Sequence, residues 1–202
     1  MYQRFREQLS EFPVVTLQDI KITFPDFDTK NLVNWQKKGY LVKLRNGFYV
    51  FRETDIDEYL LYKIANKIYE PSYISLESAL SFYGIIPEAV FIMQSVSTRK
   101  TKCFETPVGV FNFRTIKHSL YFGYRLISKN GYTFRFASRE KAVLDFLYLR
   151  PEIKDYAGIE ALRWNREELQ KLKIEKLCEY LTLYSSATLN EKINLLINYI
   201  HD

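Results

Sequence analysis

The sequence has few of the residues that build metal centres, disulfide frameworks and catalytic acid–base pairs. Among 202 residues there are two cysteines and two histidines. Cys103 and Cys178 lie far apart and lack a Cys-x-x-Cys or Cys/His spacing, so we expect plain thiols and neither a zinc site nor a disulfide. His118 and His201 have no second ligand or nucleophile at a useful spacing, and neither is a candidate catalytic base. No cofactor is expected.

Long apolar runs and glycine-rich loops are missing as well. Lys, Arg or Asn interrupts the apolar segments well before the roughly 20 residues that cross a bilayer. Residues 1–13 mix charged and apolar positions and lack the continuous apolar segment of a secretory signal. No Gly-rich phosphate loop is present. We therefore expect a cytoplasmic protein without membrane contacts.

What the chain does contain is enough apolar sequence for a core and an uneven distribution of charge. With 47% hydrophobic and 26% charged residues it should form one or two globular domains. The net charge is +4 over residues 1–52, −5 over 53–89, +7 over 90–136 and −1 over 137–202. This alternation predicts two basic surfaces separated by an acidic helix.

The first basic block shows a clear order of elements. A helix is expected from Tyr2 to Phe12, a second one capped by Thr16, and a third one running from Asp28 or Thr29 to about Lys38, with Gly39 ending it. Apolar segments at 40–44 and 47–51 flank Asn46-Gly47, the dipeptide that best tolerates positive φ at both positions of a tight hairpin. Three helices followed by a hairpin indicate a winged helix-turn-helix, which we assign to residues 1–53.

The third helix of this unit presents a basic face. Leu32 and Trp35 can point inward, with Val33 or Gln36 at the edge of the buried stripe, which leaves the lysines on the opposite side. No acidic residue occurs from Lys30 to Arg52, whereas a merely soluble surface mixes both signs. Lysine suits phosphates and guanine, and asparagine can pair with adenine. The predicted DNA-binding residues are Lys30, Asn31, Asn34, Lys37 and Lys38 on the helix, and Lys43, Arg45 and Asn46 on the hairpin, or wing.

Residues 54–202 are expected to form a second, α+β domain. Helices are predicted at 55–69 and from Ser75 to 82 or 83, then a mainly antiparallel, meandering sheet from strands at 91–96, 108–116, 120–127 and 132–136. Ser138 should cap a helix to Leu149, and three or so helices should follow, the last opened by a capping box at 188–191. The sheet carries the second predicted basic patch, formed by Arg99, Lys100, Lys102, Arg114, Lys117 and Arg125.

Two other functions remain as alternatives. A protein-interaction module could use the same basic surfaces to bind an acidic partner. A metal-dependent nuclease would need carboxylates and a lysine, for which Asp145, Glu152 and Lys154 are the candidates. Their placement disfavours it, because Asp145 is expected inside a helix and Glu152 in a loop, whereas such a Glu-x-Lys belongs on a strand. We therefore expect no enzymatic activity.

Three sequence motifs carry a resemblance to a known family. They are KKGYL and RNGFY at 37–41 and 45–49, SYISLESAL and YG at 72–80 and 83–84, and ASREKAVLD at 137–145. Over about residues 14–149 the chain resembles the AbiEi family of abortive-infection antitoxins. It departs from the family pattern at Arg139, where proline often stands. The two later motifs are also expected to serve the fold, with Lys141 and Asp145 forming an i, i+4 pair worth ~0.3 kcal/mol.

The resemblance implies a function. Members of this family repress their own operon and counter a nucleotidyltransferase-like toxin. The family's DNA-reading surface corresponds to the third helix and the wing. One winged-helix unit meets few base pairs. We therefore expect two copies of the protein to bind repeated half-sites in the double-stranded DNA of its own promoter.

Overall fold

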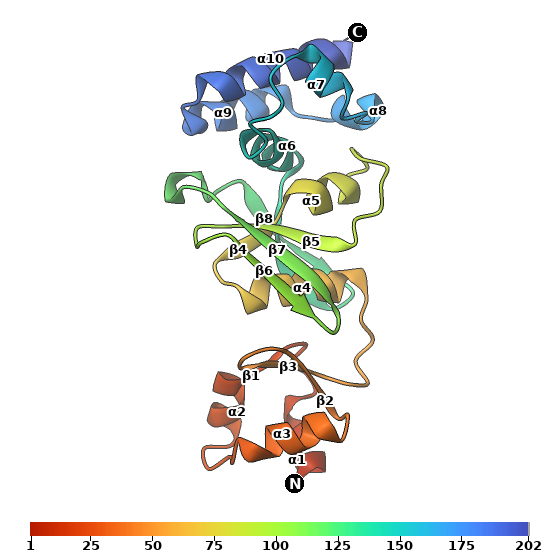
Figure 1. Cartoon of the computed structure of the whole chain (residues 1–202), viewed down its shortest axis with the longest axis vertical. Coiled ribbons are helices and arrows are strands. Elements are labelled where there is room, and N and C mark those ends of the chain that lie inside the picture. Colours follow the sequence, from red (N-terminus) through yellow and green to blue (C-terminus); the bar gives the residue numbers. More distant parts are fainter. Residues whose placement is uncertain (202) are drawn as a thin grey trace.

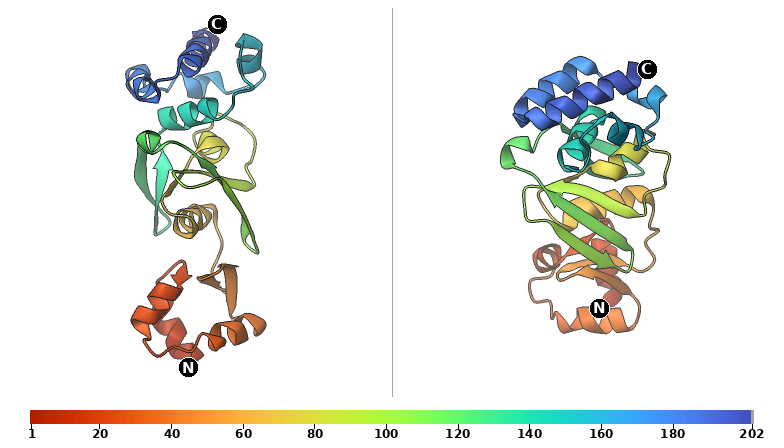
Figure 2. Two further views of the ribbon diagram at one scale, coloured as in Figure 1. Left: turned by 60° about the vertical axis from the view of Figure 1, so that its left-hand side comes forward. Right: turned by 45° about the horizontal axis from the view of Figure 1, so that its top comes forward.

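The protein has an α+β fold in which three layers follow one another along the long axis. We describe residues 1–201 from a computed structural model, which contains ten α-helices, a three-stranded antiparallel sheet and a six-stranded mixed sheet. The N-terminal lobe lies at one end, the large sheet in the middle and the C-terminal helices at the other end (Figure 1). Two further views show the same arrangement (Figure 2).

The N-terminal lobe contains three helices and three short strands. The helices are α1 (Tyr2–Leu9), α2 (Leu17–Thr23) and α3 (Lys30–Lys37), and the strands are β1 (Val15–Thr16), β2 (Leu41–Arg45) and β3 (Phe48–Phe51), in the sheet order β1-β3-β2. The helices follow the predicted order, but α1 ends three residues earlier than predicted and β1 was not predicted. Thr16 opens α2 with a capping box to Asp19. The lobe packs around an aromatic cluster that includes Phe5, Phe27 and Trp35.

The β2–β3 hairpin differs in detail from the expected tight turn. Gly47 has a φ of +83°, whereas Asn46 does not adopt a positive φ. A register shift between Lys43 and Arg45 adds a bulge just before the turn. A side chain at position 47 would also approach the Leu17 side chain closely. Glycine is therefore required at the second turn position only.

The large sheet is mixed: three of its five strand pairs are antiparallel, as expected for a mainly antiparallel sheet, but the strands do not follow the predicted meander order. Its strands are β4 (Ser72–Ile74), β5 (Ile92–Ser97), β6 (Lys102–Thr106), β7 (Gly109–Thr115), β8 (Tyr124–Lys129) and β9 (Tyr132–Ala137), in the order β6-β7-β5-β4-β9-β8. The pairs β5–β7 and β4–β9 are parallel. β4 and β6 were not predicted. β7 carries the fully buried Phe111 and Phe113 and so occupies an interior position, while β6, with its exposed Lys102 and Glu105, takes the edge.

Three helices pack against this sheet. They are α4 (Glu58–Ile68), α5 (Leu76–Phe82) and α6 (Arg139–Tyr148). On α4, the buried Tyr62 ring lies against Phe134 and Phe136 of β9. The α4 side chain of Asn66 accepts a hydrogen bond of 2.5 Å from the backbone N–H of Arg135. Because β4 pairs with β9 only at Ile74, this Asn66 side chain satisfies a β9 backbone N–H that has no partner in β4.

The chain ends in a helical layer on the far side of α6. A 3-10 turn (His118–Leu120) follows β7, and the layer itself contains α7 (Tyr156–Glu160), α8 (Arg166–Leu169), α9 (Ile174–Tyr184) and α10 (Ala187–His201). The predicted capping box at 188–191 is wrong, because Thr188 lies inside α10 and the Ser186 hydroxyl accepts the Leu189 N–H instead. Within residues 1–201, no helix is long and apolar enough to span a membrane.

Candidate nucleic-acid interface

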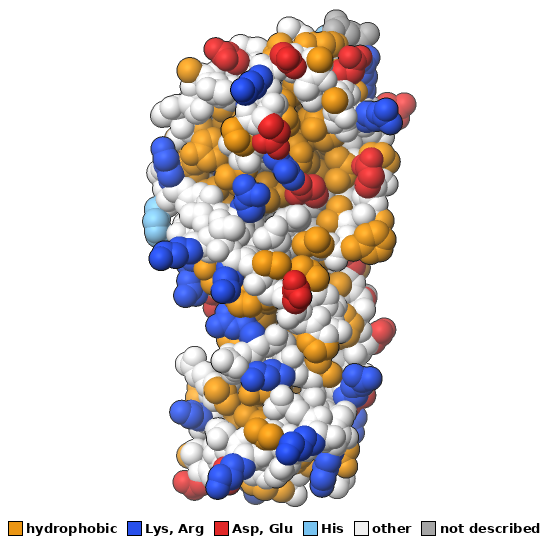
Figure 3. All heavy atoms as spheres, in the orientation of Figure 1, with side chains coloured by type: hydrophobic (Ala, Val, Ile, Leu, Met, Phe, Trp, Pro, Cys, Tyr) orange, Lys and Arg blue, Asp and Glu red, His pale blue; other side chains and the backbone are white. Residues whose placement is uncertain are grey.

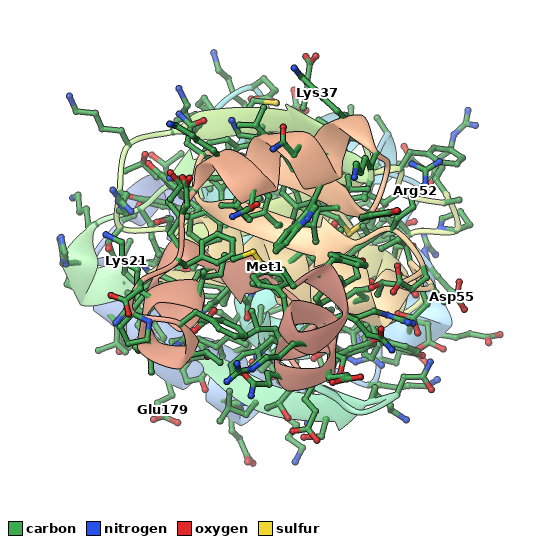
Figure 4. The ribbon with its side chains drawn as sticks, turned by 90° about the horizontal axis from the view of Figure 1, so that it is seen from below. Met1, Lys21, Lys37, Arg52, Asp55 and Glu179 are labelled. Atoms are coloured by element: carbon green, nitrogen blue, oxygen red, sulfur yellow. The ribbon has the colours of Figure 1, made fainter. Side chains whose placement is uncertain are left out.

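The α3 helix exposes the basic face that its sequence predicts. Leu32 and Trp35 are buried in the N-terminal core. The remaining predicted positions on the helix surface, Lys30, Asn34, Lys37 and Lys38, are exposed. Seen from the N-terminal end, the Lys37 side chain projects away from the ribbon (Figure 4). Lys and Arg side chains predominate over acidic ones on the visible face of this lobe (Figure 3).

A hollow beside α3 separates the helix from the hairpin. It has a volume of about 580 Å³ and is lined by Leu17, Thr29, Leu32, Val33, Gln36, Lys37, Lys43 and Tyr49. Lys43 is exposed on β2, so this hollow lies between cations of both elements. Val33 is also exposed here, at 52%. Lys37 of α3 and Lys43 of β2 therefore line the same hollow.

The two predicted asparagines on α3 have different surroundings. The Asn31 side-chain amide donates a 3.0 Å hydrogen bond to the Asp28 carbonyl, and Asp28 accepts the Lys30 N–H with its carboxylate at 2.9 Å. Asn31 therefore helps to form the start of the helix. Asn34 is exposed in the middle of the basic face.

Arg45, which the sequence predicts to bind DNA from the wing, contacts the larger lobe in the structure. Its guanidinium donates a 2.5 Å hydrogen bond to the Ile68 carbonyl at the end of α4. It also lies over the rings of Phe48 and Phe104, at 4.8 and 5.0 Å from their centroids. Burial, followed by the nearby positive charge of Arg99, lowers the pKa of Arg45 from its ordinary value. Arg45 thus joins the N-terminal lobe to the large sheet.

The whole hairpin shares this joining role. Leu41, Tyr49 and Phe51 pack into the N-terminal core, whereas Leu44 and Val50 belong to the core of the larger lobe. Both faces of the hairpin are therefore covered, and Figure 1 shows β2 and β3 on the side of the lobe that faces the large sheet. The bulge before Arg45 accounts for this contact, because it turns the side chain toward the larger lobe. Of the predicted wing residues, Lys43 and Asn46 remain exposed.

The second predicted basic patch is divided by the sheet. Lys100 is exposed in the β5–β6 turn, and Lys102 is exposed on β6. Lys117 is exposed just after β7. The end of β7 lies beside the β5–β6 turn, because the Thr115 hydroxyl donates a hydrogen bond to the Arg99 carbonyl. Arg114 is half-buried and lies on the sheet face opposite to Phe113. Arg125 is on β8, at the other edge of the sheet, and its pairing places it on the face of Phe136 beside Tyr83.

Arg99 is committed to a structural contact within this patch. Its guanidinium donates to the Glu70 carbonyl at 3.1 Å and lies over the Tyr69 ring at 4.7 Å. Arg99 itself remains exposed, and together with Lys100, Lys102 and Lys117 it forms a basic corner, which we call the β6 corner. This corner adjoins the junction between the lobes, since Arg99 is near enough to Arg45 to lower its pKa.

The two later motifs meet in one buried polar network. Asp145 accepts hydrogen bonds from Tyr73 at 2.8 Å, from Ser75 at 2.9 Å and from Tyr184 of α9 at 2.7 Å. The Lys141 ammonium donates to Asp145 and to Tyr184, each at 2.6 Å. Lys141 and Asp145 are fully buried.

The burial of this network changes its energetics from those of a surface pair. Burial lowers the pKa of Lys141 from its ordinary value, and the charge and hydrogen bond of Asp145 oppose that shift. Burial and the Asp145 charge raise the pKa of Tyr73 and of Tyr184 well above 10. The predicted surface value of ~0.3 kcal/mol is therefore the wrong scale for Lys141–Asp145. The structure shows that these motif residues connect β4, α6 and α9.

The nuclease candidates do not converge. Asp145 is held inside the buried network, whereas Glu152 is exposed and lies 3.6 Å from Arg150 in an ion pair. Across residues 1–201, no group of three or more His, Cys, Asp and Glu side chains is arranged to hold a metal ion. Both cysteines are free and exposed.

The surface that remains from the predictions is the basic face of α3 with Lys43. The sequence analysis assigns Val33 to the edge of the buried stripe and does not include it among the residues of this face. The spacing could have indicated its exposure, because Val33 lies one turn before Lys37 on the same side of the helix. The chain matches no model of a known protein family, and a comparison with curated proteins likewise gives no match.

Proposed function

We propose that this protein is a DNA-binding transcriptional regulator whose N-terminal lobe is a winged helix-turn-helix with α3 as the recognition helix. The observation that carries the proposal is the exposed face of α3, where Lys30, Lys37 and Lys38 surround Asn34 and continue into Lys43 on β2. Cations of this kind neutralise phosphates, and an asparagine among them can pair with an adenine edge. Phosphate contacts supply affinity, and Asn34 supplies part of the sequence preference.

The hairpin has a different task from a free wing in this proposal. Because Arg45 and the apolar face of the hairpin bind the larger lobe, the two lobes are held in a defined orientation. DNA bound at α3 would then meet the larger lobe in one orientation. Each chain offers one α3, so operator binding uses copies of the protein on repeated half-sites.

The larger lobe serves the antitoxin activity in this proposal. The resemblance to AbiEi proteins suggests repression of the protein's own promoter and the neutralisation of a nucleotidyltransferase-like toxin. Its two most specific motifs build the buried network that joins the sheet to the C-terminal helices. These motifs therefore support a fold shared with AbiEi proteins. In this proposal, the toxin binds to exposed residues of the larger lobe outside the network. No catalytic step belongs to the proposal.

The test is binding to a labelled duplex that covers the DNA upstream of the gene, measured by fluorescence anisotropy. We expect the full-length protein to prefer this duplex over a scrambled duplex of equal length and composition. Asn34→Ala should reduce that preference more than it reduces affinity for the scrambled duplex. Lys154→Ala, which changes an exposed cation at the opposite end of the molecule, is the matched control.

The acidic-partner alternative gives a different result in the same assay. If the surface served an acidic protein, polyglutamate would compete as well as unlabelled duplex does at equal charge concentration. Equal binding to the upstream and scrambled duplexes, together with such competition, would overturn the proposal.

A further inference from the structure

An exposed apolar side chain lies at the edge of the basic face of α3, on the side of the hairpin. Val33 is 52% exposed, although its neighbours on this surface are Asn34, Lys37 and, one turn earlier, Lys30. Valine is also a poorer helix former than the polar residues that usually occupy exposed helix positions. Helix propensity therefore does not favour a valine at this position.

The position of Val33 relates it to the proposed recognition surface. It lines the hollow between α3 and the hairpin together with Lys37 and Lys43. Leu32 and Trp35 define the buried side of α3, and Val33 lies on the outward half of the helix, on the side of the hairpin. A duplex that meets Lys37 and Asn34 would therefore also meet the two methyl groups of Val33.

The major groove offers one apolar feature to such a side chain. Among the base edges, only thymine presents a methyl group there, and apolar side chains contact it. Lysines beside the valine would bind flanking phosphates and exclude water from the rim of this contact. A valine next to an asparagine also suits adjacent A·T pairs, since asparagine pairs with adenine.

We infer that Val33 is a specificity-determining residue that reads a thymine methyl group in the major groove. The inference rests on the proposed DNA-binding function and adds the base class that α3 selects. It assigns to each half-site at least one thymine whose C5-methyl group packs against Val33, beside an adenine paired with Asn34.

The experiment compares thymine with deoxyuracil, which differs only by the absence of the C5-methyl group. Duplexes are first selected from a random-sequence library with the full-length protein. In the selected duplex, each thymine is then replaced singly by deoxyuracil, and dissociation constants are measured. For the wild-type protein we expect one position in each half-site where the replacement weakens binding by about fourfold, the effect of one methyl group losing its contact.

The variant Val33→Ala should bind the thymine and deoxyuracil duplexes equally at that position. Leu183→Ala is the matched control, because Leu183 is equally exposed, at 52%, but lies on α9 in the C-terminal layer. It should keep the fourfold difference. Since Val33 is exposed, its truncation leaves the buried core intact, which an unchanged thermal unfolding curve would verify.

Three results would overturn the inference. The wild-type protein could show no thymine–deoxyuracil difference at any position, or Val33→Ala could retain the wild-type difference. In both cases a selective duplex exists, so the DNA-binding proposal stands while the role of Val33 is refuted. If selection yields no preferred duplex at all, the DNA-binding proposal itself fails, and the inference fails with it.

Discussion

Replacing Lys141 by methionine tests the importance of the buried network most severely. The change removes the cation that lies 2.6 Å from the Asp145 carboxylate and 2.6 Å from the Tyr184 hydroxyl. Methionine fills most of the lysine stem, so the change removes charge more than volume. Asp145 is then a buried carboxylate without a counter-charge.

The expected cost follows from what remains around Asp145. Breaking a buried ion pair by removing one partner costs about 3–5 kcal/mol. The hydroxyls of Tyr73, Ser75 and Tyr184 still donate to the carboxylate, which keeps the cost of Lys141→Met near the lower end of that range, about 3 kcal/mol. For a chain of this size, this corresponds to a decrease in Tm of roughly 6–12 °C.

The assay is urea and thermal unfolding at pH 7, followed by circular dichroism, with a surface lysine as the control. Lys171→Met breaks an exposed pair with Glu168 and should leave the Tm almost unchanged, because Lys171 is 59% exposed and solvent screens the pair. Asp145→Asn in the Lys141→Met background removes the uncompensated charge and should restore a large part of the lost stability. Equal and small effects of Lys141→Met and Lys171→Met would refute the reasoning.

Three further changes have expected outcomes. Lys192→Met should cost about 2 kcal/mol in urea unfolding, because the buried Lys192 ammonium donates to the Leu147 and Arg150 carbonyls at the end of α6 and so fixes α10; a loss below ~0.5 kcal/mol would contradict this. The pKa of Glu140 lies below its ordinary value of 4.5, because burial, which raises it, is outweighed by hydrogen bonds from its own backbone N–H, Lys176 and the Lys173 N–H. The Glu140 carboxylate therefore contributes fully to the stability of the folded protein above pH 4.5, and this contribution is lost as the pH falls through the folded-state pKa. Glu140→Gln should make the decrease in Tm between pH 5 and pH 3 smaller. An unchanged decrease in Tm would contradict this role of Glu140. Charge reversal of Lys100 and Lys102 in the β6 corner should weaken DNA binding without changing the preferred operator; if DNA binding is unaffected while protection against the cognate toxin is lost, this corner belongs to the antitoxin activity instead.

Much of the N-terminal lobe could be predicted from local sequence signals. Thr16, Gly39 and the apolar spacing of Leu32 and Trp35 mark helix ends and faces through nearest-neighbour chemistry alone. The exposed lysines of α3 follow from the same spacing. The role of Arg45 could not be predicted, because it depends on a bulge and on a carbonyl 23 residues away in the other lobe.

Local sequence signals predict the larger lobe only in part. The strand β9 alternates in polarity, and β8 and β9 flank a clear turn, so both are predicted; however, the predicted segment 120–127 begins four residues before β8 and ends two residues early. The strands β4 and β6 were missed, since β4 has only three residues and β6 is an exposed edge strand. The parallel pairing of β5 with β7 is a choice between long-range partners, which no local pattern encodes. The network around Asp145 likewise joins residues that lie far apart in the sequence.

The most direct test of the central claim is the salt dependence of duplex binding. The variant Lys37→Ala, Lys38→Ala, Lys43→Ala removes the exposed cations of α3 and β2 and omits Arg45, which the fold itself uses. Each lost phosphate contact reduces the magnitude of the slope of log affinity against log salt by ~0.9, so the loss of three contacts should reduce it by ~2.7. The control, Lys154→Ala, Lys171→Ala, Lys173→Ala, changes three exposed lysines in the C-terminal layer and should keep the wild-type slope. If the folded α3 variant binds with the wild-type affinity and slope, α3 is not the DNA-binding surface.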